Sequence, residues 1–68
     1  MEPLILVYYY YDECHNVLET MEVFPYVDLI IIRKRYDFYY VNTFVSTRFN
    51  LNPEQEWIQA HGAQTINL

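Results

Sequence analysis

The chain has 68 residues, a net charge of −5 and one cysteine, Cys14, so it allows one small domain and excludes an internal disulfide. With 53% hydrophobic residues and eight tyrosines, the composition excludes an intrinsically disordered chain. The negative charge repels the phosphate backbone of nucleic acids and therefore weighs against a conventional DNA-binding domain.

The first predicted element is a strand over residues 3–11. Its residues are leucine, isoleucine, valine and four consecutive tyrosines, all of which favour strands. Because the apolar side chains fall on both faces, the pattern indicates an interior strand of a sheet.

The next segment is predicted to be an amphipathic helix that begins after Asp12 as N-cap and ends before Pro25. Its apolar stripe has helical spacing and consists of Cys14, Val17, Leu18 and Met21. On this interpretation Cys14 is a small buried hydrophobic residue. The remaining surface is acidic and carries Glu13, Glu19 and Glu22.

Two further strands are predicted over Val27–Tyr36 and Phe38–Phe49, each rich in aliphatic or aromatic residues. The chain has neither Asn-Gly nor Asp-Gly at a hairpin position, so the turn between these strands is weakly marked. We place it at residues 35–37, with residues 42–43 as the alternative, which would add a fourth strand.

A final helix is predicted to open at Asn52-Pro53 and to end at Gly62, with Trp57 and Ile58 facing inward. Residues 63–68 form a tail or a short extra strand.

These elements predict a single α+β domain over residues 1–68, in the order strand, helix, strand, strand, helix (β-α-β-β-α). We expect a three-stranded or four-stranded sheet with helices packed on one face, and a first strand parallel to the second through a right-handed crossover. The other face would expose aromatic side chains unless another chain covers it. Small size and surplus aromatic surface favour a homodimer.

The chemistry-bearing residues do not assemble into a catalytic set. The string Asp12-Glu13-Cys14-His15 resembles the second motif of superfamily 2 helicases, which implies a magnesium-nucleotide site there. That chemistry also needs a Gly-Lys-Ser/Thr phosphate loop, and Gly62 is the only glycine of the sequence. We therefore interpret the string as a helix start and expect no cofactor.

A zinc site is disfavoured because adjacent helical residues such as Cys14 and His15 point about 100° apart, and His61 alone does not complete a ligand set. The acidic neighbours of Cys14 oppose formation of a thiolate nucleophile. We expect no metal, no catalytic residue and no enzymatic activity.

Two functions remain. The first is a protein-interaction module, a regulator or inhibitor, that binds a protein partner through an aromatic sheet face, an exposed strand or the acidic helix. Its candidate anchors were chosen on residue type and expected exposure: Tyr8, Tyr10, Tyr39, Tyr40 and Trp57. The acidic candidates are Glu13, Glu19 and Glu22.

The alternative is a small protein that binds RNA or single-stranded DNA through basic residues and nearby aromatics. Its candidates are Arg33, Lys34, Arg35 and Arg48. Along a strand Arg33 and Arg35 point to one face and Lys34 to the other, so these three cations do not form one patch.

The sequence also carries expectations about location. The residues after Met1 show no basic segment with a cleavage site, and no apolar run approaches the ~18 residues of a membrane span, so we expect neither a signal peptide nor a membrane partner. A lone thiol fits a cytoplasmic protein. The amino-acid usage follows AT-rich codons, which suggests a virus or plasmid gene and, if viral, the host cytoplasm.

Overall fold

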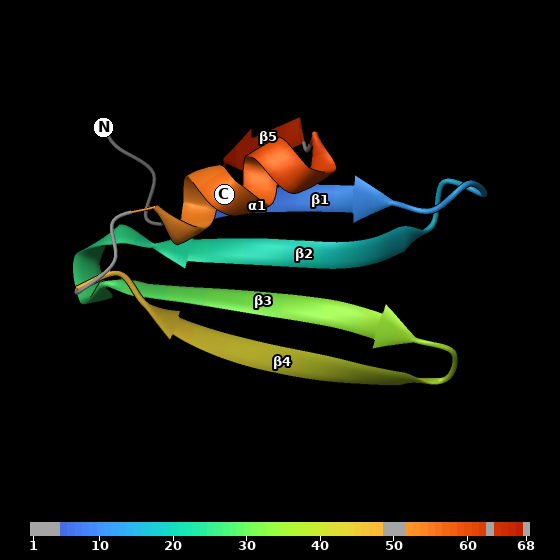
Figure 1. Ribbon diagram of the computed structural model, residues 1–68, viewed down its shortest axis with the longest axis horizontal. Helices are drawn as coiled ribbons and strands as arrows, with labels where there is room; N and C mark the ends of the chain where they lie inside the picture. The colour runs from blue at the N-terminus through green and yellow to red at the C-terminus, as the bar shows by residue number, and fades with distance from the viewer. Residues whose placement is uncertain (1–4, 49–51, 63, 68) are drawn as a thin grey trace.

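The computed structural model describes residues 5–48, 52–62 and 64–67 and contains one antiparallel sheet with one α-helix. The strands lie in the order β4-β3-β2-β1-β5 across the sheet (Figure 1). The elements are β1 (Leu6–Tyr11), β2 (Val17–Phe24), a short 3-10 turn (Pro25–Val27), β3 (Leu29–Tyr36), β4 (Tyr39–Ser46), α1 (Pro53–His61) and β5 (Gln64–Asn67). The protein is therefore a small α+β domain, as predicted.

The predicted first helix is wrong, because residues 17–24 form strand β2. This strand pairs antiparallel with β1 on one side and with β3 on the other. Its burial alternates, with Glu19, Met21 and Val23 buried. Placing a strand here completes the hydrogen-bond ladders of two apolar strands, and this tertiary gain overrides the helical spacing of the sequence. The expected right-handed crossover is wrong for the same reason: β1 and β3 run in the same direction, but β2 lies between them and pairs with both.

The turns use left-handed residues other than glycine. Asp12 and Asn16 close the β1–β2 turn, in which His15 has a φ of 63° and its N–H donates to the Asp12 carbonyl. Asp37, with a φ of 34°, begins the two-residue β3–β4 turn. Turn placement at residues 35–37 was therefore close, whereas the alternative at residues 42–43 lies in the middle of β4.

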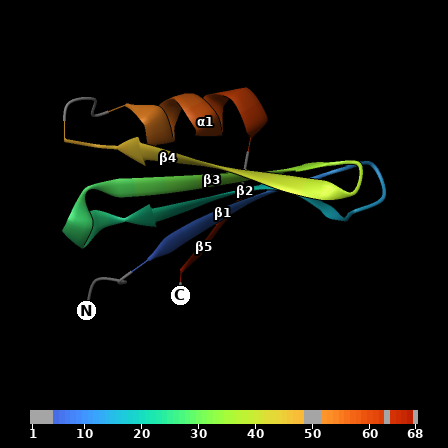
Figure 2. The ribbon, with the colours of Figure 1, turned by 90° about the horizontal axis from the view of Figure 1, so that it is seen from below.

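The predicted final helix is confirmed. Pro53 opens α1, and Gly62 ends it with a φ of 60° and an N–H that donates to the Ile58 carbonyl. The helix lies in the chain between β4 and β5, the two edge strands of the sheet, and it lies across one face (Figure 2). In the part of the chain that the structure describes, no helix is long and apolar enough to cross a membrane.

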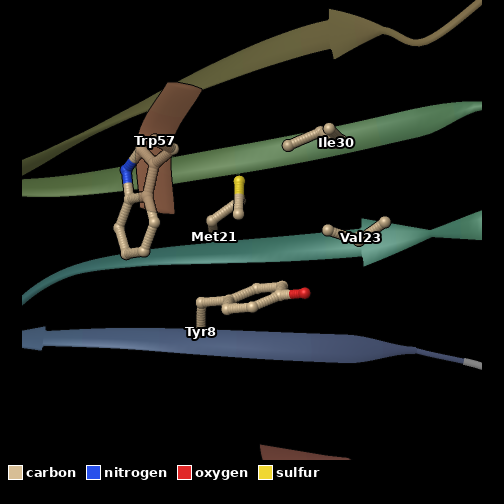
Figure 3. Packing of buried hydrophobic residues seen from close by; sticks show 5 residues of the cluster. All are labelled: Tyr8, Met21, Val23, Ile30 and Trp57. Atoms are coloured by element: carbon tan, nitrogen blue, oxygen red, sulfur yellow. The ribbon is translucent and has the colours of Figure 1, made fainter. Parts of the chain in front are cut away.

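The core lies between this helix and the sheet. Met21 and Ile30 are completely buried, and Trp57 of α1 packs over them beside Tyr8 (Figure 3). Half-buried apolar side chains surround this cluster: Leu6, Tyr10, Ile32, Val45 and Ile58. Because α1 has only nine residues, it covers the part of the sheet around Met21 and Ile30 and leaves the turn end of the β3–β4 hairpin exposed.

Candidate functional site

The strand register separates the sheet into a helix face and an open face. Tyr8 and Met21 pair with each other across β1 and β2, and both side chains face the helix. Successive residues of a strand alternate between the two faces, so the neighbours of Tyr8 and Met21 in the sequence point to the opposite side. In the described part of the chain no element packs on that side (Figure 2). The open face carries Tyr9, Thr20, Glu22, Ile31, Arg33, Tyr40, Asn42 and Phe44.

Exposed apolar side chains gather on the β3–β4 hairpin. We define the hairpin surface as Tyr36, Phe38, Tyr39, Tyr40, Val41 and Phe44, all of which are exposed. Phe38 is 92% exposed and Phe44 67% exposed, values that a core residue does not have. The Tyr39 ring stacks on the Tyr36 ring, with centroids 5.5 Å apart, and meets the Phe38 ring edge-on at 6.0 Å. The three aromatic rings at the turn therefore pack against one another.

Strand β4 is an unprotected sheet edge. Among the residues that the structure describes, β4 pairs with β3 alone, in a ladder of eight residue pairs without a bulge. Its sequence, YYVNTFVS, contains no charged residue and no proline. Natural proteins usually block a sheet edge with charges, prolines or bulges, because its free backbone groups can pair with another strand. None of these devices is present in β4.

The basic cluster is divided as the sequence predicted. Arg33 and Arg35 occupy the open face and Lys34 the helix face. Arg33 lies over the Tyr40 ring at 4.1 Å, and Lys34 lies near the Tyr36 ring at 5.2 Å. These cations therefore extend the aromatic hairpin surface on both faces.

The third cation, Arg35, is neutralised within the protein. Its Nη2 lies 2.6 Å from Oδ2 of Asp12, and its Nη1 donates to the Val17 carbonyl. The other carboxylate oxygen of Asp12 accepts the backbone N–H groups of Cys14 and Asn16, both at 2.9 Å. The Arg35 guanidinium, followed by these N–H donors, lowers the pKa of Asp12 below its ordinary value of 3.8.

A shallow hollow on the open face carries charges of both signs. It lies between Tyr9 and Tyr40, and its wall includes both Arg33 and Glu22. A phosphate placed there would meet the carboxylate as well as the guanidinium. This hollow therefore does not form an anion-binding site.

A buried polar network fixes α1 to the sheet. Glu19 is only 8% exposed and accepts the indole N–H of Trp57 at 2.8 Å. Its second oxygen lies 3.0 Å from Nε2 of His61, whose Nδ1 lies 2.8 Å from the Trp57 carbonyl. The Trp57 carbonyl only accepts, so Nδ1 of His61 carries the hydrogen of this contact. The ring of His61 also stacks on Trp57 and meets Tyr10 edge-on.

The predicted anchors separate into exposed and buried groups. Tyr39 and Tyr40 are exposed on the hairpin surface. The expected exposure is wrong for Tyr8 and Trp57, which belong to the core, and Tyr10 is half-buried against His61. Phe38 and Phe44 were not among the predicted anchors, although the alternation of the sequence places Phe44 on the same face as Tyr40.

The predicted acidic helix face does not exist. Glu13 lies in the β1–β2 turn, and Glu22 is half-buried on the open face. Glu19 points the other way, into the network below α1. Because these carboxylates lie in different places, they do not act as one acidic surface.

Cys14 is exposed in the β1–β2 turn and is not the buried residue that the helical pattern predicted. Among residues 5–48, 52–62 and 64–67, no three His, Cys, Asp or Glu side chains come together in a way that could hold a metal ion. The candidate site is therefore the hairpin surface and not a cluster of titratable side chains.

We found no match for this chain among protein-family models, curated proteins or solved structures.

Proposed function

We propose that this chain is a small, non-enzymatic protein-interaction module, a regulator or inhibitor, that binds its partner through the hairpin surface. The observation that carries the proposal is the combination of an uncharged, unblocked β4 edge with exposed aromatic side chains beside it. A sheet edge binds an extended strand by main-chain hydrogen bonds, and neighbouring aromatics supply affinity.

The charge arrangement favours a protein partner over a nucleic acid. Of the three cations on β3, Arg35 is held by Asp12 and Arg33 shares its hollow with Glu22. Arg33 and Lys34 each lie beside a tyrosine ring, where they enlarge an aromatic binding surface. Arginine and tyrosine are both enriched among the residues that dominate protein interfaces.

The proposal is tested by affinity capture of the tagged protein from a nuclease-treated and an untreated lysate of its source cells. The double variant Tyr40→Ser/Phe44→Ser removes two exposed rings from the hairpin surface. The matched control, Tyr26→Ser/Val27→Ser, removes two similarly exposed apolar side chains from the 3-10 turn.

We expect a protein that survives nuclease, is lost with the hairpin variant and is retained with the control. Equal capture by both variants would reject the hairpin surface as the binding site. Material that disappears after nuclease treatment would instead favour nucleic-acid binding and make replacement of Arg33 and Lys34 the next experiment.

A further inference from the structure

We propose that a second copy of this chain occupies the β4 edge, forming a two-fold dimer in which β4 pairs antiparallel with β4 of the partner. This inference rests on the proposed function, because it assigns an occupant to the same hairpin surface. The two sheets would join into one continuous sheet, and the junction would remove both unprotected edges.

The residues of β4 are chemically symmetric about Asn42. In an antiparallel pair centred on this residue, opposing residue numbers add up to the same value, so Asn42 meets its own copy. Tyr40 then lies opposite Phe44 of the second copy, and Tyr39 lies opposite Val45. Aromatic–aromatic and aromatic–β-branched pairs are among the stabilising cross-strand combinations. A strand of this composition is therefore complementary to itself.

Strand β4 brings no like charges together across the junction. Its residues, Tyr39–Ser46, carry no charged side chain, so the antiparallel pair sets only uncharged residues opposite one another. Before Tyr39 the chain turns back into β3, so the pairing ends with the strand itself.

The size of the junction sets the expected affinity. Eight residues of strand are about 26 Å long, and a junction one strand long buries less than the roughly 800 Å² per partner of a standard interface. Exposed rings on both faces add contact area. We therefore expect a dimer that dissociates at micromolar concentrations.

The test is sedimentation velocity of the full chain over a wide concentration range, with Asn42→Asp as the variant. The substitution places two carboxylates opposite each other at the centre of the junction. Within one copy, the new carboxylate lies beside Arg33, its cross-strand neighbour, so the fold is not expected to suffer. Thr20→Asp is the matched control, because Thr20 is the neighbour of Arg33 on the other side, away from the junction.

We expect the wild type and Thr20→Asp to shift from monomer to dimer together, and Asn42→Asp to need about tenfold higher concentration. A second measurement fixes the register. In a Cys14→Ser background, Asn42→Cys should form an intermolecular disulfide under mild oxidation, whereas Thr20→Cys should not.

A wild-type chain that stays monomeric at millimolar concentration would overturn the inference. So would a dimer that is insensitive to Asn42→Asp and is not cross-linked through Cys at position 42. These failures differ from failure of the proposed function: a monomer that still captures a protein through Tyr40 and Phe44 leaves the module standing with a different partner.

Discussion

A single carboxylate connects two distant parts of the chain. Asp12 closes the β1–β2 turn through two backbone N–H groups and binds Arg35 of β3 through its other oxygen. Both interactions are more favourable with the ionised carboxylate than with the protonated carboxyl group, so together they lower the pKa of Asp12. Asp12 was predicted to cap a helix; it does accept backbone N–H groups, but they belong to a turn.

This lowered pKa predicts a pH-dependent contribution to stability. The contribution is fully present above the unfolded-state pKa, near 3.8, and is lost as the pH falls through the lower value of the folded state. We expect Asp12→Asn to be less stable than the wild type at about pH 6 and the difference to shrink at about pH 2, as measured by urea unfolding.

The neighbouring substitution Glu13→Gln removes one charge from the same turn and leaves the hydrogen bonds of Asp12 intact, so it serves as the control. It should follow the wild type at both pH values. If Asp12→Asn differs from the wild type equally at both pH values, the charge of Asp12 is not the source of the effect.

Residue identity alone does not predict the exposure of Cys14 or the position of the turns. Sequence-based placement of turns relies on glycine and asparagine, and the single glycine of this chain ends α1. His15, Asp28 and Asp37 adopt the left-handed conformation instead. Nothing in a histidine distinguishes such a turn from a helix, so the β1–β2 turn could not be found from the sequence.

At the scale of elements, the strongly apolar segments were predictable, whereas β2, which mixes polar and apolar residues, was not. The central residues of β1, β3 and β4 and the bounds of α1 were predicted nearly as observed. Segment β2 satisfies both a helical and an alternating pattern, and only its two apolar neighbours decide between them. The hairpin surface was partly predicted, through Tyr39 and Tyr40, because edge position depends on strand order.

The attachment of α1 to the sheet also depends on contacts between two elements, α1 and β2. Glu19 of β2 accepts from Trp57, and it faces His61 as well. We expect Glu19→Ala to lower the free energy of unfolding by about 2–3 kcal/mol, because it leaves the buried indole N–H without an acceptor. Chemical denaturation measures this loss.

The variant Glu19→Gln separates shape from charge. Its amide oxygen can accept from Trp57, and its NH₂ can donate to Nε2 of a neutral His61, so we expect a loss below about 1 kcal/mol. Chemical denaturation compares the free energies of unfolding of the two variants with that of the wild type. Equal destabilisation by alanine and glutamine would contradict this account.

At the scale of the whole molecule, β1 owes its interior position to β5, the short strand at the sheet edge opposite β4. Strand β5 pairs with β1 and so keeps this apolar strand in the interior of the sheet. The interior position of β1 was predicted, but its second neighbour comes from the far end of the chain. Such long-range pairing leaves no periodic signal in a four-residue strand.

Removal of residues 64–68 should therefore cause aggregation by exposing the edge of β1. We expect the truncated chain to have a smaller soluble fraction and to scatter more light than the full chain. Adding Tyr9→Lys to the truncated chain places a charge on the newly exposed strand and should restore part of the solubility. A truncated chain that remains folded and monomeric would show that β5 does not protect β1.

The pairing of Leu6 with Asn67 has a practical consequence for handling the protein. The polypeptide enters and leaves the sheet on adjacent strands, three and four positions away from β4 in the strand order. A purification tag, fluorescent protein or surface linker fused at either end is thus tethered on the side remote from the hairpin surface. Immobilised or labelled forms should keep β4 accessible, whichever terminus carries the fusion.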